Sequence, residues 1–253
     1  MRLAVAGATG QLGRRVAATA EDAGHRVVRI SRATGVDLTT GAGLPEALRG
    51  VDAVIDASST GSMRARESIE FFGAVTRHLL AAEEAEGVPH HVAVSIVGAA
   101  RLGAGYYAGK RVQEELVTGR PGGWSLLRTT QFHGFVRQLI PAGRLGPIQL
   151  VPTMRAQPVA VDEVAAELVR IASGAPLGVV RDLAGPREER MAELVARYLR
   201  ATGERRRVLQ LPFPGAWGRG MRDGSLLPGP DAGLGTQTFD DWLRVSAEGA
   251  DRD

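Results

Sequence analysis

The chain has 253 residues, of which 44% are apolar and 23% are charged, a balance that is typical of a globular protein. Its 31 basic residues nearly match its 28 acidic ones, so the net charge of +3 gives little reason to expect nucleic-acid binding. Cysteine is absent, which excludes disulfides and thiolate catalysis, and the five histidines show no metal-ligand spacing. We therefore expect no metal, no nucleic-acid partner and no membrane segment, and we interpret the chain as cytoplasmic.

The amino-terminal residues 1–16 predict a strand, a tight turn and a helix. A short apolar run at 3–6 ends in three glycines with the spacing G-x-x-G-x-x-G, and a helical pattern of apolar residues follows. In a dinucleotide site such glycines permit the turn, let a pyrophosphate approach the backbone and let the helix close on the strand. A merely structural turn is the alternative. The predicted phosphate-binding residues are Gly7, Thr9, Gly10, Gln11, Leu12 and Gly13.

A second strand is predicted at 25–31, and it ends at Ser31 and Arg32. A fold that prefers NAD usually places Asp or Glu near this point to hold the ribose 2′-hydroxyl, and none is present. The hydroxyl and the guanidinium favour a 2′-phosphate instead, so we predict that NADP(H) is preferred over NAD(H). The alternative is that Arg29 and Arg32 are solvated loop charges.

Strands and helices alternate through the rest of the first half of the chain. Asp37, the competing acidic residue, and Leu38 lie in a short third strand, 36–38, that we expect to edge the adenine pocket. A buried strand at 51–58 ends at Ser58 and Ser59, in a loop expected to pass beneath the cofactor. Further strands are predicted at 91–97 and 124–128, and helices at 44–49, 67–86 and 107–118. Such β-α-β units give a parallel sheet, whose ligands sit at the carboxyl ends of its strands.

The alternation loosens after Arg128. Helices are predicted at 162–173, where Asp162 is the expected cap, and at 188–201, with a last strand at 179–184 and a capping box at 238–241. The irregular segments here are free to cover the ligand edge, so we predict that they contact the substrate. For His133 alone, a structural role is the commoner alternative. The predicted substrate residues are Gln131, Phe132, His133 and Trp217.

The expected fold class is α/β, with a Rossmann-type doubly wound parallel sheet and a small C-terminal lobe that covers the substrate. We expect one domain over 1–253, with the nucleotide-binding core at 1–128 and residues 129–253 completing the core and covering the substrate.

Ser95, Tyr106 and Lys110 form the candidate catalytic set. Ser95 lies near the end of a predicted strand, and Tyr106 and Lys110 are four residues apart, so on a helix they share a face. Carbonyl reduction needs a proton donor at the oxygen, which a phenol can be if its pKa falls from about 10. We expect Lys110, the only lysine of the chain, to lower the phenol pKa. The alternative is a partly buried surface tyrosine beside a lysine with no special role.

These residues, together with the glycine spacing and the stretch 127–133, resemble the short-chain dehydrogenase/reductase superfamily, in its atypical branch of NmrA-like NAD(P)H-binding proteins. The resemblance implies a Rossmann fold, NADP(H) binding, contact of Lys110 with the cofactor and, for many members, reduction of a small carbonyl or quinone-like substrate. The Asn-Asn-Ala-Gly motif of the typical branch is absent, and residues 57–60 take its place.

We therefore expect an NADPH-dependent reductase whose partner is a small-molecule substrate. Two alternatives stay open: a non-catalytic regulatory protein that senses NADP(H), and a nucleotide-retaining epimerase or dehydratase. The sequence carries no signal of an oligomeric state.

Overall fold

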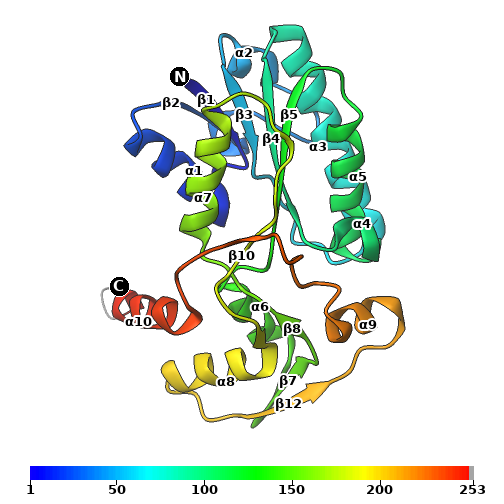
Figure 1. The fold of residues 1–253 in the computed structure, drawn as a ribbon, viewed down its shortest axis with the longest axis vertical. Coiled ribbons are helices and arrows are strands. Elements are labelled where there is room, and N and C mark those ends of the chain that lie inside the picture. The colour runs from blue at the N-terminus through cyan, green and yellow to red at the C-terminus, as the bar shows by residue number, and fades with distance from the viewer. Residues whose placement is uncertain (251–253) are drawn as a thin grey trace. The chain divides into compact units, whose positions relative to one another are not determined.

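The structure is a computed structural model that describes residues 1–250, with side chains up to residue 246 (Figure 1). It divides into two compact units. The first consists of Met1–Arg128 and Val161–Arg181, and the second of Thr129–Ala160 and the described residues from 182 onward.

The first unit is built on a parallel sheet with the strand order β2-β1-β3-β4-β5, in which β9 pairs with β5. The order reverses between β1 and β3, and in open α/β sheets a ligand crevice opens at such a reversal, outside the carboxyl ends of the strands. The bounds are β1 Arg2–Ala6, β2 Arg26–Ile30, β3 Ala53–Asp56, β4 His90–Ile96, β5 Gly123–Thr129 and β9 Gly178–Val179.

Helices cover both faces of this sheet, which confirms the predicted Rossmann-type doubly wound fold. α1 packs against α7, and α3 against α5; the two pairs lie on opposite sides of the sheet (Figure 1). α3 ends where predicted, because Gly87 takes up a left-handed φ of +68°. The bounds are α1 Gln11–Asp22, η1 Arg32–Thr34, α2 Leu44–Leu48, α3 Ala65–Glu86, α4 Ala99–Leu102, α5 Tyr106–Thr118 and α7 Val161–Ala172.

The strand predicted at 36–38 does not form. Only an isolated bridge joins Asp37 to Ala42, because the Asp37 carboxylate accepts hydrogen bonds from the backbone N–H and the hydroxyl of Thr39 and so turns the chain. These bonds also hold the pKa of Asp37 below its usual value. Leu38 still packs against the buried cluster of the sheet, so the segment covers the core as a turn rather than as a strand.

The second unit carries smaller sheets. β7 pairs in parallel with β12 and antiparallel with β6, β8 pairs antiparallel with β11, and β10 pairs in parallel with Thr129 and with β13. The bounds are α6 Phe135–Ala142, β6 Arg144–Leu145, β7 Ile148–Pro152, β8 Arg155–Ala156, β10 Leu183–Ala184, β11 Glu189–Arg190, α8 Met191–Ala201, β12 Arg207–Leu211, α9 Gly215–Asp223, β13 Gly233–Leu234 and α10 Phe239–Ala250.

Three predictions for the later elements need correction, and one is confirmed. The strand expected at 179–184 is two separate pieces, β9 and β10, and the helix expected from 188 begins at Met191, because the two residues before it pair with β8. Asp162 does not cap α7 but lies in its first turn, where it forms a salt bridge of 3.2 Å with Arg15. The capping box of Thr238 and Asp241 is present, with reciprocal bonds of 3.1 and 3.2 Å.

Candidate functional site

The glycine turn joins β1 to α1. Gly7 has a φ of +74°, and a Cβ there would lie 2.8 Å from the Ala57 carbonyl oxygen. A Cβ on Gly13 would collide with the carbonyl oxygen of Gly7, so these two glycines are required by the fold itself. At Gly10 the nearest atom would be that same oxygen, at 3.2 Å. The missing side chain of Gly10 therefore mainly leaves the backbone open to a ligand.

The amino end of α1 offers backbone donors to such a ligand. The first N–H groups of a helix have no acceptor within the helix, and the dipole adds partial positive charge. No acidic residue occupies the first turn of α1. Thr9, Gly10 and Gln11 are exposed, whereas the side chain of Leu12 is buried and leaves only its amide for binding. This arrangement suits a phosphate group.

The residues after β2 form the edge predicted to select the nucleotide. Ser31 is buried, and its hydroxyl lies 3.4 Å from the Thr34 hydroxyl within η1. Arg29 is bound to Glu21, with an N–O distance of 2.8 Å, while Arg32 is exposed. Of these two guanidinium groups, Arg29 is thus held by Glu21, whereas the charge of Arg32 acts on Asp37 and helps to lower the pKa of that carboxylate.

The loop after β3 connects the glycine turn to the predicted proton donor. Ala57 and Ser58 approach Gly7 closely enough to exclude a side chain there. The next residue, Ser59, has its hydroxyl oxygen 3.0 Å from the phenol oxygen of Tyr106. The hydroxyl of Ser58 is buried and has no hydrogen-bond partner among the described residues, which is costly unless a ligand atom supplies one. One loop thus brings the two predicted halves of the site to the same edge.

Tyr106 begins α5, and its ring packs edge-on against Phe72, with 5.3 Å between the ring centres. Burial raises the pKa of the phenol to about 12, and the hydrogen bond with Ser59 offsets only part of this effect. The sequence-based prediction that Lys110 lowers the pKa of the Tyr106 phenol is therefore wrong, because in this structure the pKa is raised. The phenol keeps its proton at neutral pH and remains a hydrogen-bond donor.

The ammonium of Lys110 lies in the core of the first unit. Its Nζ donates hydrogen bonds of 2.9 Å to the Val94 carbonyl and 2.9 Å to the side-chain oxygen of Gln113, and it lies 4.3 Å from the centre of the Phe72 ring. Gln113 in turn donates to Asp56 at 2.7 Å. These contacts form a buried polar network of Lys110, Gln113 and Asp56.

Burial also explains the ionisation of Lys110. Loss of solvent lowers the pKa of its ammonium to about 8, although the nearby charge of Asp56 acts in the opposite direction. The ammonium is bonded to Val94 and Gln113, and the phenol pKa of Tyr106 is raised by burial and lowered in part by the hydrogen bond with Ser59.

Ser95 is fully buried in β4. Its hydroxyl has no hydrogen-bond partner among residues 1–246, and the hydroxyl that bonds Tyr106 belongs to Ser59. Of the three predicted catalytic residues, Tyr106 therefore lies beside the loop that approaches the glycine turn, whereas Lys110 and Ser95 lie within the core.

His133 has the contacts of a structural residue in the second unit. Its Nε2 lies 3.1 Å from the Gln237 carbonyl oxygen, and its ring packs against Phe239 and Trp242 at 5.9 and 6.1 Å between centres. These contacts match the alternative given for this histidine, in which it holds the start of α10 against the segment after β5.

The other three predicted substrate residues also belong to the second unit. Gln131 and Phe132 are half-buried, and Phe132 forms an isolated parallel bridge with Val159. Trp217, in α9, packs edge-on against Phe213, and its indole N–H is buried without a hydrogen-bond partner among the described residues.

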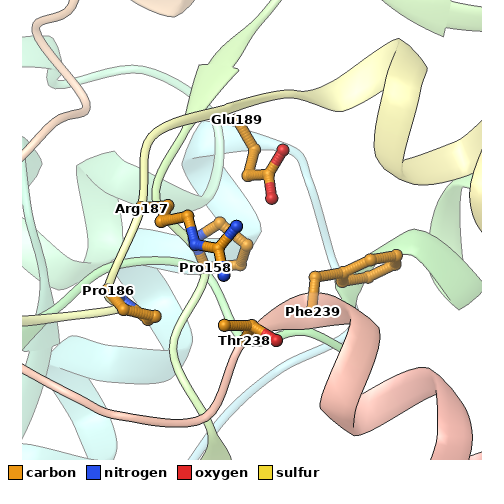
Figure 2. Close-up of a pocket in the computed structure, with 6 residues that line it drawn as sticks. All are labelled: Pro158, Pro186, Arg187, Glu189, Thr238 and Phe239. Atoms are coloured by element: carbon orange, nitrogen blue, oxygen red, sulfur yellow. The ribbon is translucent and has the colours of Figure 1, made fainter.

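Figure 2 shows a small cavity of the second unit, in which the Glu189 carboxylate and the Phe239 ring approach from different segments. Its volume of about 10 Å³ is at the lower limit of what one water molecule needs. None of the predicted substrate residues lines it, so we assign it no ligand. The lining residues are Pro158, Pro186, Arg187, Glu189, Thr238 and Phe239.

Two residues of the Lys110 network, Gln113 and the Asp56 that accepts a bond from it, are not predicted from the sequence. A signal for Asp56 exists, because a carboxylate inside a continuous apolar strand is rarely fully buried without a partner. Gln113 follows Lys110 by three residues on α5, a spacing at which helical side chains meet. Phe72, which contacts both Tyr106 and Lys110, comes from α3 and carries no comparable signal in the sequence.

Comparison with family models and with curated protein sequences finds no match. Among residues 1–250, no helix combines the length and apolar character needed to cross a bilayer.

Solved structures resemble the chain over nearly its whole length. A short-chain dehydrogenase/reductase superfamily protein from Agrobacterium tumefaciens with bound NAD is 18% identical, with a TM-score of 0.72 over 100% of this chain and 98% of that one. The NADPH-dependent quinone oxidoreductase of Escherichia coli, complexed with NADPH, is 18% identical, with a TM-score of 0.73 over 96% and 99%. UDP-glucose 4-epimerase from Bifidobacterium longum is 15% identical, with a TM-score of 0.74 over 100% and 99%. The predicted resemblance to short-chain dehydrogenase/reductase proteins is thus confirmed for the fold.

Proposed function

We propose that this chain is an NADPH-dependent reductase that reduces a small carbonyl or quinone-like substrate by hydride transfer. The observation that carries the proposal is the loop after β3, which touches Gly7 of the phosphate-type turn and bonds the Tyr106 phenol through Ser59. The similar fold of the quinone oxidoreductase that binds NADPH adds support.

The chain's own groups have distinct tasks in this reaction. The glycine turn and the amino end of α1 hold the pyrophosphate, Arg32 meets the 2′-phosphate, and NADPH supplies the hydride when bound. As hydride adds to the substrate carbon, the phenol of Tyr106 stabilises the growing negative charge on oxygen and transfers its proton to it. The exposed hydroxyl of Ser59 then returns a proton to the phenolate and takes one from water. Gln131, Phe132 and Trp217 remain the proposed substrate residues, whereas the contacts of His133 favour a structural role for it.

Cofactor choice is tested by calorimetric titration of NADPH and NADH. A charge-assisted hydrogen bond contributes about 1.5–3 kcal/mol, so Arg32→Ala should weaken NADPH binding by roughly 10–100-fold and leave NADH binding unchanged. Arg49→Ala, a substitution of an exposed arginine between α2 and β3, is the matched control and should bind both nucleotides normally. Equal affinity of the wild type for NADPH and NADH would contradict the assignment.

A second candidate function is a nucleotide-binding protein that does not turn over. Ser95 is fully buried and Lys110 is bonded into the core, so two of the three expected catalytic groups are not at the ligand edge. A sensor needs the nucleotide site but not the phenol of Tyr106. A loss of NADPH oxidation in Tyr106→Phe therefore favours the reductase over the sensor. An epimerase or dehydratase would keep its nucleotide through turnover, so net oxidation of NADPH argues against that class.

A further inference from the structure

A cavity of about 170 Å³ lies within the second unit. Half of its lining residues are arginines, and they come from three different elements: Arg155 from β8, Arg190 from β11 and Arg222 from α9. The remaining lining residues are Thr153, Met154 and Gln210. The volume is similar to the roughly 150 Å³ of an apolar cavity that holds benzene, so a group of phosphate size fits.

Two of these arginines face each other across a ladder. In the antiparallel pair of β8 and β11, Arg190 is directly opposite Arg155, so their side chains leave the ladder on the same face. Like charges directly opposite one another destabilise a strand pair. An anion placed against this face removes that repulsion.

The protein's own acceptors leave part of this charge available. Arg155 is bound through two hydrogen bonds of 2.6 and 2.9 Å to Glu188, and Arg222 donates one bond of 2.8 Å to the neutral Phe213 carbonyl. Arg190 is exposed and forms no side-chain hydrogen bond or salt bridge with any described residue, although its charge is close enough to Glu188 to help lower the pKa of that carboxylate.

The other nearby carboxylate is Asp223, which acts on the charge of Arg155 but already accepts bonds from the backbone N–H and the hydroxyl of Ser225. A guanidinium has five N–H donors, so Arg190 and Arg222 keep several donors for a ligand. Planar donors of this kind match the oxygens of a phosphate.

We propose that this cavity binds a phosphate group, held by Arg190 and Arg222 with Arg155 as the fixed third charge. Thr153 and Gln210 add neutral donors, and Met154 supplies an apolar wall for the carbon attached to a phosphate ester. The ligand is either inorganic phosphate or a small phosphate monoester. The site goes beyond the reductase function and does not depend on it.

Calorimetry on the full chain without nucleotide tests the site, with inorganic phosphate and glycerol 1-phosphate as probes at constant ionic strength. Saturable one-to-one binding is expected, and Arg190→Gln should weaken it at least about 10-fold, the usual effect of losing a charge-assisted bond. Arg222→Gln gives a second, independent loss. Tighter binding of the ester assigns the site to a monoester, and equal binding assigns it to a phosphate group alone.

The control is Arg205→Gln, which removes an exposed arginine of the same unit that lies outside the cavity and should bind the probes normally. NADPH affinity should be unchanged in Arg190→Gln. Titration with NADPH therefore tests the nucleotide site, and titration with the two phosphate probes tests the cavity. The proposal is overturned if neither probe binds saturably, if Arg205→Gln weakens binding as much as Arg190→Gln, or if Arg190→Gln loses NADPH.

Discussion

Lys110 is the one ammonium side chain of the protein, and its environment predicts an ionisation that can be seen directly. Burial lowers its pKa to about 8. Because the chain contains no other lysine, labelling with [ε-¹³C]lysine gives a single side-chain resonance that needs no assignment. We expect this resonance to titrate near pH 8.

The charge of Asp56 raises the pKa of Lys110, so Asp56→Asn should move the midpoint lower still. Glu46→Gln, a change on the exposed side of α2, should leave it in place. A midpoint at the ordinary value of 10.5 in the wild type would mean that the ammonium is solvated rather than bound to Val94 and Gln113.

Gly10 and Gly13 of the first turn have different roles, and substitution by alanine distinguishes them. At Gly13 a Cβ collides with the Gly7 carbonyl oxygen, so Gly13→Ala should cost roughly 1–3 kcal/mol in the free energy of unfolding, as overpacking does. Gly10→Ala meets only one atom, at 3.2 Å, and should unfold nearly as the wild type does in urea. If the turn is a phosphate site, Gly10→Ala nevertheless weakens NADPH binding about 10-fold or more. Normal NADPH binding by Gly10→Ala would favour the purely structural turn.

At the residue scale, the spacing of the glycines in the sequence predicted the turn, but the spacing of Tyr106 and Lys110 did not predict their pKa values. The contacts of Gly7 and Gly13 follow from the strand, turn and helix that the local sequence specifies. The pKa of Tyr106 depends on burial against Phe72, which comes from a different helix. A four-residue spacing placed Lys110 on the same face as Tyr106 but did not show that its ammonium reaches Val94 instead.

At the scale of the elements, a buried ionic cluster ties α3 and β4 to the end of α5. Glu83 accepts bonds of 2.7 Å from His91 and 2.5 Å from Arg120. Burial alone would lower the pKa of His91, but the charge and the hydrogen bond of Glu83 raise it above its ordinary value. The folded state therefore holds this proton more tightly than the unfolded state does.

The stabilisation from protonated His91 is fully present below about pH 6.5, the ordinary value, and is lost as the pH rises through the raised pKa of His91. In urea unfolding, His91→Gln should lose more stability relative to the wild type at pH 5.5 than at pH 9. Glu83→Gln should abolish this difference between the two pH values. A loss that is the same at both would show that His91 is neutral in the fold.

Strong periodicity predicted the main helices and strands of the first unit, and weak or local signals explain the errors. The continuous apolar runs of β3, β4 and β5 specify buried parallel strands. Residues 36–38 have similar composition, yet the Asp37 side chain turns the chain through bonds to Thr39. The two-residue strands β8, β9, β10 and β11 are too short to carry any periodic signal.

At the scale of the whole molecule, the β-α-β alternation was enough to predict the Rossmann-type sheet. The assignment of segments to the two units could not be predicted in this way. Residues 161–181 belong to the first unit, although the 32 residues before them, Thr129–Ala160, belong to the second. The helix at 161–172 looks like any other amphipathic helix, and its packing against α1, β3 and β4 assigns it to the sheet.

The reductase proposal predicts that nucleotide stabilises the first unit. NADPH bound to the folded state alone raises stability by about 2.7 kcal/mol at 100 times its dissociation constant. Hydrogen exchange should slow most at the amino end of α1 and in the loop after β3, where Ser58 gains a partner for its buried hydroxyl. Protection confined to the second unit would place the nucleotide elsewhere.

The most direct measurement is the rate of NADPH oxidation by Tyr106→Phe and Tyr107→Phe with a panel of quinones, ketones and enones. Tyr106→Phe keeps the ring against Phe72 and removes the hydroxyl that bonds Ser59, so turnover should fall by about 10²–10⁴ while NADPH affinity is preserved. Tyr107→Phe changes the neighbouring ring on α5 and should keep the activity of the wild type. Full activity in Tyr106→Phe with a substrate that the wild type reduces would contradict the account, because the proton would then come from another group.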